Sequence, residues 1–201
     1  MDTMNKPNHM FSQPVIDFFF RWHWWVAHIV FVPVVILSLI IGIYYMNMSL
    51  GAAALTFVGG VFFWTLFEYF MHRFMFHEFS HVSGLSHLHY VIHGMHHVYP
   101  TDPYRVIFPP FLSILVGGLL AGILALILPL TWFFGVLAGF IAGYCWYEFV
   151  HYASHHIKWK TLLLKRLKRH HLLHHHNEAY KDKNYGVTTV LWDRVFSTYM
   201  S

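Results

Sequence analysis

The stretch of residues 106–147 contains no charged residue, and this severely limits how the chain can fold. A helix needs about 20 mostly apolar residues to cross the roughly 30 Å of hydrocarbon in a bilayer, so the stretch is long enough for two such helices. Pro129, within residues 128–131, marks a natural break between them. The stretch therefore predicts a transmembrane helical hairpin.

Two further apolar stretches, at about residues 28–46 and 50–69, have a similar length. With 57% hydrophobic and only 11% charged residues, the composition excludes an ordinary soluble domain. We expect an all-α integral membrane protein with one membrane-embedded domain over residues 1–201, and no cleaved signal peptide. Its four transmembrane helices, at about residues 28–46, 50–69, 108–128 and 130–150, would form two hairpins.

The positive charges indicate which way the helices cross the membrane. Every lysine and arginine lies in the N-terminal arm, in residues 73–105, or from residue 158 onward, whereas the expected turns at residues 46–49 and 128–131 have none. With four spans, the three charged regions share one side, which the positive-inside rule makes cytoplasmic. That side would face the cytoplasm from a bacterial inner membrane or from the endoplasmic reticulum. Basic residues placed beside the membrane favour contact with anionic headgroups and indicate no nucleic-acid partner.

Histidines are clustered at the ends of the expected spans. The chain has 19 histidines, and ten of them form four patterned clusters: His72, His77, His93, His96, His97, His151, His155, His171, His174 and His175. Imidazole is a common neutral metal ligand, and the charge argument places all four clusters on the same membrane face. A single cysteine, Cys145, excludes a cysteine-rich metal site. We therefore expect a cytoplasmic helical cap that holds a histidine-rich dinuclear metal site.

The spacing within the clusters suggests how the rings point. Each helical residue advances about 100°, so the three histidines of the HxxHH pattern at residues 93–97 lie within roughly one sector, and we expect them to face one ion. Residues 171–175 repeat this pattern, and His151 and His155 share one helix face. Three or more nitrogen donors for each ion leave a coordination position for oxygen or substrate, which is typical of a catalytic site.

His72 and His77 do not fit one face of an ideal helix, because five residues rotate the chain by about 140° from the starting direction. Either a helix end or bend separates them, or they bind different ions. Glu68 precedes His72 by about one turn, and Glu148 precedes His151 by three residues. We expect each carboxylate to accept the outer N–H of the ligating imidazole that follows it.

Two other histidines are candidates to support the ligands from outside. They are His156 and His170, which directly adjoin the patterned clusters. The remaining histidines lie outside the patterns, and we interpret them as ordinary core or surface residues.

Four segments carry a resemblance to a known family. They are residues 67–77, residues 93–97 with the following Pro100, Asp102, Arg105, Pro109 and Pro110, residues 147–156, and residues 171–175 with 186–193. The chain resembles the fatty acid hydroxylase superfamily from about residue 15 onward, and the fatty acid 2-hydroxylases most of all. An HxxHH pattern alone is shared with sterol desaturases and carotenoid hydroxylases, whereas the loop at residues 93–110 is more specific.

The resemblance implies an oxidoreductase that uses O2 to hydroxylate carbon 2 of a fatty acyl chain, free or in a ceramide or other sphingolipid. It also implies that the ten patterned histidines are ligands and that Tyr144, Tyr147 and Glu148 line the site. The family commonly has Asp at position 148, Tyr at position 170 and Gly at position 197, where this chain has Glu148, His170 and Ser197. These departures leave the ligand set unchanged.

The reaction also decides which metal we expect. Attack on an unactivated C–H bond by oxygen requires a metal that changes oxidation state, which zinc does not, and imidazole suits iron. We therefore expect two iron ions in the working enzyme. Zinc also binds nitrogen sites well and could occupy an isolated sample.

Partners and alternatives follow from the same resemblance. Longer relatives carry a fused cytochrome b5 domain that these residues lack, so we expect a separate electron donor, either a cytochrome b5-like protein, a ferredoxin or a reductase. A sterol or carotenoid hydroxylase or desaturase is the main alternative. A metal transporter fits less well, because transporters bind their ions near the bilayer midplane, whereas these clusters lie at one face. A binding protein without catalytic activity remains a further alternative.

Overall fold

The computed structural model describes residues 19–82, 84 and 86–201, and every regular element within this part of the chain is helical. The first 18 residues of the expected domain lie outside the described residues. The helices are α2 (Trp24–Ile40), α3 (Leu50–Phe70), α4 (Ser86–His89), α5 (Met95–Val98), α6 (Pro110–Ile127), α7 (Leu130–His156), α8 (Leu162–His176) and α9 (Leu191–Val195). Wider π-helical turns cover Ile41–Tyr45, Met71–Met75 and Tyr90–Gly94, and 3-10 turns cover Glu78–His81 and Glu178–Tyr180.

Four helical segments are long and apolar enough to cross a membrane. They are Trp24–Tyr45, Leu50–Met75, Pro110–Ile127 and Leu130–His156. Their number and order agree with the expectation, and the chain is a multi-pass membrane protein. The second and fourth segments extend past the expected residues 69 and 150, because helical backbone continues through the histidine-bearing turns. Large apolar side chains such as Leu126 are exposed along these helices, as contact with lipid requires.

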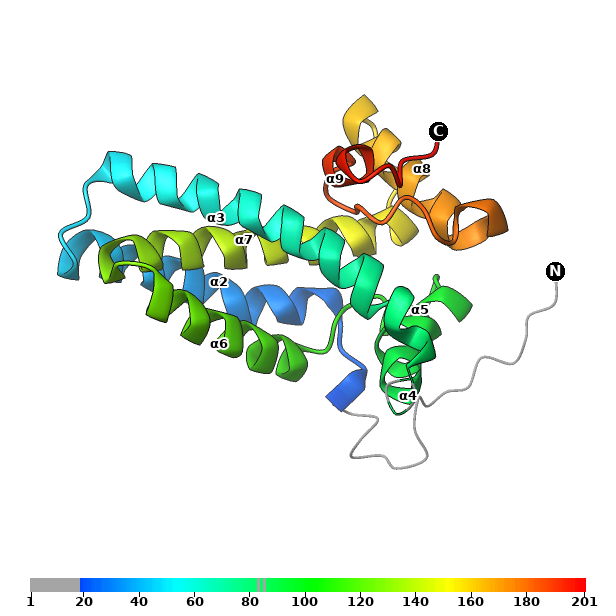
Figure 1. The fold of residues 1–201 in the computed structure, drawn as a ribbon, viewed down its shortest axis with the longest axis horizontal. Coiled ribbons are helices and arrows are strands. Elements are labelled where there is room, and N and C mark those ends of the chain that lie inside the picture. The colour runs from blue at the N-terminus through cyan, green and yellow to red at the C-terminus, as the bar shows by residue number, and fades with distance from the viewer. Residues whose placement is uncertain (1–18, 83, 85) are drawn as a thin grey trace.

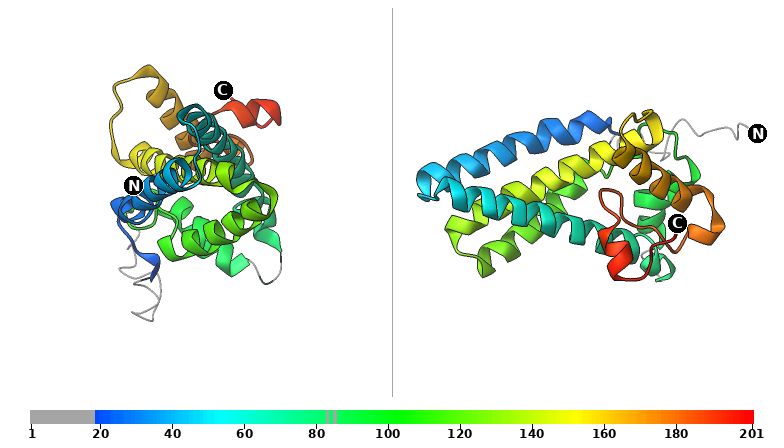
Figure 2. Two further views of the ribbon diagram at one scale, coloured as in Figure 1. Left: turned by 90° about the vertical axis from the view of Figure 1, so that its left-hand side faces the viewer. Right: turned by 90° about the horizontal axis from the view of Figure 1, so that it is seen from above.

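The spans form a bundle with the histidine-rich segments at one end. In Figure 1, α2, α3, α6 and α7 lie side by side, with the turns after α2 and α6 at the left end. The short helices α4 and α5, together with α8 and α9, gather at the right end, and the right-hand view in Figure 2 shows the same division. The structure therefore contains the helical cap that the sequence predicts.

Glycines bring α3 and α7 into close backbone contact. A Cβ atom added at Gly139 of α7 would lie 1.9 Å from the carbonyl oxygen of Phe57 in α3, and one added at Gly60 of α3 would lie 2.2 Å from that of Val136 in α7. Small residues of this kind allow membrane helices to pack without a side chain between them. Because α3 leads to His72 and α7 carries His151, this contact helps to set where the histidines meet in the cap.

Candidate metal centre

All ten patterned histidines come together at the cap end of the bundle, in two groups of five. Within each group, one ring nitrogen from every residue lies within 4.8 Å of the others. The first group contains His72, His77, His93, His97 and His174, and the second contains His96, His151, His155, His171 and His175. The structure thus assembles the complete set of histidines that the sequence singles out.

A change in helix geometry brings His72 and His77 together. Regular α-helix ends at Phe70, the wider π-helical turn Met71–Met75 carries His72, and His77 follows after it. The ring centroids of the two histidines are 5.1 Å apart, and both residues belong to the first group. The bend between them is therefore the correct alternative of the two that the spacing allowed.

The prediction that each HxxHH pattern faces a single ion is wrong. His93 and His97 belong to the first group and His96 to the second, whereas His171 and His175 belong to the second group and His174 to the first. Residues four apart on a helix differ by only about 40° in direction, but neighbouring residues differ by about 100°. Each pattern therefore lies between the groups and supplies both. The groups meet where the rings of His97 and His175 stack, with centroids 4.0 Å apart.

The spacing of the nitrogens fits a metal ion in each group. In the first group, Nε2 of His93 lies 3.2 Å from Nε2 of His77 and 2.8 Å from Nε2 of His97. In the second, the Nε2 atoms of His151 and His96 are 2.8 Å apart. Two imidazole nitrogens at bonds of about 2.0–2.1 Å to one ion lie about 3 Å apart when they occupy adjacent coordination positions. The measured separations match that value.

Burial and protonation also favour metal binding. Nε2 of His72 and Nε2 of His175 are buried without a hydrogen-bond partner among the described residues, and such nitrogens are costly unless something else binds them. Burial, with a further contribution from nearby histidines, lowers the pKa of His77 to about 2 and that of His97 to about 3. These rings are neutral at pH 7, which leaves their lone pairs available to a metal.

Two backbone carbonyls fix the orientation of rings in the first group. Nδ1 of His72 donates to the carbonyl of Tyr185 at 2.5 Å, and Nδ1 of His174 donates to the carbonyl of Lys183 at 2.7 Å. Each bond leaves Nε2 of that ring as the coordinating atom. Neither contact could be predicted from the sequence, because a backbone carbonyl has no residue type by which it could be recognised.

The acidic residues have partners other than the predicted ones. Glu68 accepts hydrogen bonds from the backbone N–H groups of Val187 and Thr188, so the expected bond with the His72 ring is not formed. Glu148 accepts one from the backbone N–H of Phe108 at 3.1 Å, and within the described part of the chain Nδ1 of His151 has no hydrogen-bond partner. The predicted pairing of these carboxylates with ligating imidazoles is therefore wrong. Both side chains instead hold backbone segments next to the centre.

The two candidate supporting histidines also lie outside the groups. His170 is buried, and its Nε2 is hydrogen-bonded to a carboxylate oxygen of Asp193 at 3.0 Å. His156 is exposed and stacks on Tyr152, with ring centroids 4.4 Å apart. Burial raises the pKa of Asp193, but hydrogen bonds from His170, Gly186 and Thr198 oppose this and bring the pKa below its usual value. Asp193 was missed as a functional candidate, although an acid within the apolar tail at residues 187–196 is a recognisable signal.

An apolar cavity leads from the bundle to the histidines. It has a volume of about 450 Å³ and is lined by residues of α2, α3, α6 and α7, including Phe31, Trp64 and Leu120. Tyr144 and Tyr147 belong to its wall, whereas Glu148 does not. At the histidine end, the cavity residue Phe76 stacks on His93 with ring centroids 4.9 Å apart.

The second histidine group also contacts the cavity wall. The ring of Tyr147 lies 5.4 Å from that of His151, measured between centroids. The cavity therefore adjoins both groups, through Phe76 at the first and Tyr147 at the second.

Comparison with known proteins gives consistent results. The family model for fatty acid hydroxylase matches residues 57–198. The chain is 35% identical to the ceramide very long chain fatty acid hydroxylase of Saccharomyces cerevisiae, over 100% of this chain and 53% of the yeast protein. It is also 35% identical to a dihydroceramide fatty acyl 2-hydroxylase of Arabidopsis thaliana, over 94% of this chain and 78% of the plant protein. The chain thus spans about half the length of the yeast relative.

A solved structure shares the same fold. It is described as full-length Scs7p with only the hydroxylase domain visible, and it superimposes on this chain with a TM-score of 0.86 at 34% identity. The match covers 92% of this chain and 70% of that chain. The bundle and the cap are therefore a known arrangement.

Proposed function

This chain belongs to the fatty acid hydroxylase family, and from that premise we propose that it hydroxylates carbon 2 of a membrane fatty acyl chain, free or within a ceramide or other sphingolipid. The observation that carries the proposal is the apolar cavity whose wall contacts both histidine groups, through Phe76 and Tyr147. A cavity with so few polar residues suits a hydrocarbon chain.

We further propose that the ten histidines hold two ions and that these are iron in the working enzyme. Bound iron would supply the redox chemistry by which O2 oxidises a C–H bond, which zinc cannot supply. The overall reaction converts a C–H bond, O2, two electrons and two protons into an alcohol and water. Imidazole-only groups also bind zinc, so zinc in a purified sample is compatible with this proposal.

The residues of the cavity would choose the carbon that reacts. Apolar side chains on α2, α3, α6 and α7 bind the tail and exclude water, while the polar headgroup stays at the cap end. The depth to which the tail enters the cavity would then place a carbon close to the headgroup beside the histidines. The hydroxyl of Tyr144 in the cavity wall is hydrogen-bonded to that of Ser113 at 2.7 Å, which joins α7 to α6 across the cavity. This bond would keep the wall in place while the tail enters.

The cap is proposed to face the cytoplasm. Among the residues that the structure describes, the lysines and arginines lie on segments at the cap end, while the two opposite turns, at residues 46–49 and 128–131, carry none. Cysteine substitution tests this directly: Lys165→Cys in the exposed part of α8 should react with a membrane-impermeant thiol reagent only after cells are opened. Ser49→Cys, in a turn at the opposite end, should react in intact bacterial cells that carry the protein in their inner membrane. The reverse pattern would contradict the orientation.

Electrons are proposed to come from a separate one-electron donor on the cytoplasmic side, such as a cytochrome b5-like protein, a ferredoxin or a reductase. Reconstitution of the purified chain with each donor class, followed by measurement of product formation under O2, would identify the class that supports turnover.

Product analysis tests the proposed reaction. Expression in a host that makes no 2-hydroxy lipids should yield 2-hydroxy fatty acids in hydrolysed sphingolipid or free-acid fractions, detected by mass spectrometry. His175→Ala should abolish them because His175 belongs to the second group, whereas His176→Ala, at an exposed neighbouring residue, should retain them. Hydroxylated or desaturated sterols or carotenoids without 2-hydroxy acyl products would contradict the proposed substrate.

A further inference from the structure

Two buried carboxylates hold four consecutive backbone N–H groups near the C-terminus. Asp193 accepts from Tyr185 at 2.9 Å and from Gly186 at 2.8 Å. Glu68 accepts from Val187 at 2.7 Å and from Thr188 at 2.9 Å. We call residues 183–188 the strap. It is bound by one acid from α3 and another from α9, which are far apart in the sequence.

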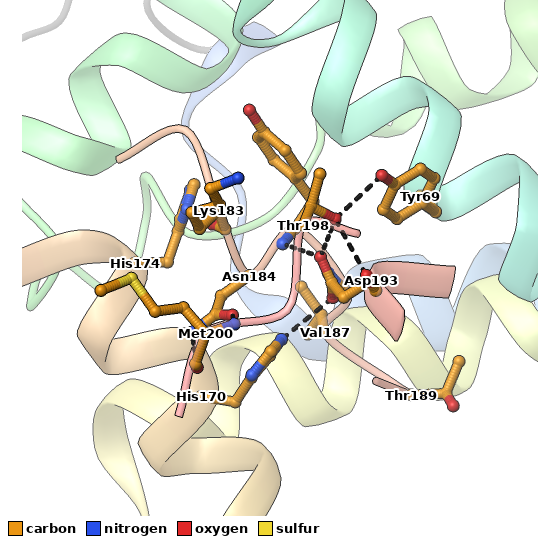
Figure 3. A network of polar contacts seen from close by, with 12 residues as sticks. Tyr69, His170, His174, Lys183, Asn184, Val187, Thr189, Asp193, Thr198 and Met200 are labelled. Carbon is orange, nitrogen blue, oxygen red and sulfur yellow. Dashed lines mark hydrogen bonds and ion pairs between the residues drawn. The ribbon is translucent and has the colours of Figure 1, made fainter. Parts of the chain in front are cut away.

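Both acids are themselves firmly anchored. The side chain of Asp193 also accepts from the hydroxyl of Thr198 at 2.8 Å and pairs with His170, as Figure 3 shows. Glu68 accepts a further bond from the hydroxyl of Thr188. Only 3% of Glu68 and 0% of Asp193 is exposed, so both carboxylates are shielded from water. Such buried, fully bonded carboxylates can fix a backbone segment in one position.

The other side of the strap faces the first histidine group. Its carbonyls at Lys183 and Tyr185 are the acceptors for Nδ1 of His174 and Nδ1 of His72. Figure 3 shows His174 next to Lys183, beside the network around Asp193. The strap thus has N–H groups bound to carboxylates and carbonyls bound to imidazoles. Any movement of the strap would release the rings of both histidines.

The second histidine group is held differently. Nδ1 atoms of all five of its members, His96, His151, His155, His171 and His175, are buried with no hydrogen-bond partner among the residues that the structure describes. The strap contacts therefore act on the first group, and the two groups differ in how their rings are oriented.

We propose that Glu68 and Asp193 are positioning residues for the ion of the first group, which act through the strap to present Nε2 of His72 and Nε2 of His174. This inference rests on the proposed two-ion centre but not on the identity of the substrate. Carboxylates and carbonyls behind metal-bound imidazoles typically contribute 10–100-fold to metal affinity. Loss of either carboxylate should therefore weaken one ion and leave the other in place.

The experiment measures bound metal in Glu68→Gln and Asp193→Asn proteins. The full chain is purified in detergent, loaded with zinc, and equilibrated with a chelator over a range of concentrations, and the metal retained is counted by mass spectrometry. The wild type should retain two ions. Each variant should release one ion at about 10–100-fold lower chelator strength while the second ion stays as tight as in the wild type. Glu178→Gln, an exposed acid in the same tail, is the matched control and should behave as the wild type.

If Glu68 and Asp193 served only the folding of the chain, the metal-retention experiment would give a different result. Weakening of both ions to the same extent, or unchanged binding of both, would overturn the proposal. If the carboxylate variants do not fold, Thr188→Val removes only one hydroxyl bond to Glu68 and should weaken the same single ion to a smaller extent. Thr189→Val, whose hydroxyl accepts from the backbone N–H of Leu191, is its control.

The proposed role of the strap and the proposed hydroxylation reaction can be refuted separately. A wild-type chain that holds two ions but makes no 2-hydroxy product would contradict the proposed reaction and leave the strap result valid. A wild-type chain that holds fewer than two ions would overturn both proposals.

Discussion

Substitution by alanine should have different effects on stability at Gly59 and Gly60, two neighbouring residues of α3. A Cβ atom at Gly60 would lie 2.2 Å from the carbonyl oxygen of Val136 and 2.8 Å from the backbone nitrogen of Phe140, whereas one at Gly59 meets nothing within 4 Å. Because real Cβ contacts essentially never fall below 3.0 Å, α3 and α7 must move apart by at least about 0.8 Å in Gly60→Ala. Both obstructing atoms belong to helix backbone and cannot rotate away.

The change in the free energy of unfolding is the sum of two opposing effects. Overpacking of a well-packed interface typically costs about 1–3 kcal/mol. Alanine is favoured over glycine inside a helix by about 0.8–1 kcal/mol, and this gain is common to both variants. Gly59→Ala should therefore be neutral or slightly stabilising. The difference between the two variants isolates the contact between α3 and α7, and we expect it to be about 1–3 kcal/mol.

Unfolding in mixed micelles measures this difference. The purified proteins are titrated with sodium dodecyl sulfate in a mild detergent, and helix content is followed by circular dichroism. We expect Gly60→Ala to unfold at a lower fraction of the denaturing detergent than the wild type and Gly59→Ala to match or exceed it. Equal midpoints for the two variants would show that α3 and α7 are not in close backbone contact at Gly60.

Three other predictions follow from the structure. Gly117→Leu fills the apolar cavity from α6. If acyl chains bind there, as proposed, this variant should lower kcat/KM for long acyl chains by at least about 10-fold relative to short ones, measured by product analysis. Gly122→Leu, outside the cavity wall, should not. Ser197 has a φ of 57°, a left-handed conformation that costs a non-glycine residue about 1–2 kcal/mol, so Ser197→Gly should raise the free energy of unfolding by about 0.5–1 kcal/mol in the micelle assay. Metal-free protein should lose stability as the pH falls below 6.5, because histidines in the unfolded chain take up protons there, whereas the buried His77 and His97 rings, with pKa values of about 2 and 3, stay neutral. Each such ring lowers the free energy of unfolding by up to about 1.4 kcal/mol per pH unit. A melting temperature that stays constant from pH 7.5 to 5.5 would contradict this.

Much of the architecture could be predicted because it depends on local composition. The uncharged residues 106–147 can satisfy their backbone in a bilayer only as helices, and Pro129 marks the turn between them. The ten histidines could be expected on one membrane face because an even number of spans, four, returns all charged segments and the histidines beside them to the same side. Neither argument needs to know which side chains touch.

The division of the histidines could not be predicted in the same way. Helical spacing tells which residues share a face, as it does for His151 and His155, but not how many centres lie in front of that face. His96 of α5 joins His151 of α7 because tertiary packing brings their Nε2 atoms within 2.8 Å of each other. The partners of Glu68 were hidden for a similar reason, since Val187 and Thr188 contribute backbone N–H groups from a distant part of the chain.

The stacked rings of His97 and His175 affect how genetic experiments on this protein should be interpreted. One ring belongs to each group, and their centroids are 4.0 Å apart, so removing either ring takes away packing from a residue of the other group. Substitutions of residues in direct contact are commonly non-additive by about 0.5–3 kcal/mol. Single alanine variants at positions 97 and 175 are therefore expected to affect both histidine groups. Epistasis between positions 97 and 175, measured in a double-mutant cycle, would report how strongly one half of the centre depends on the other.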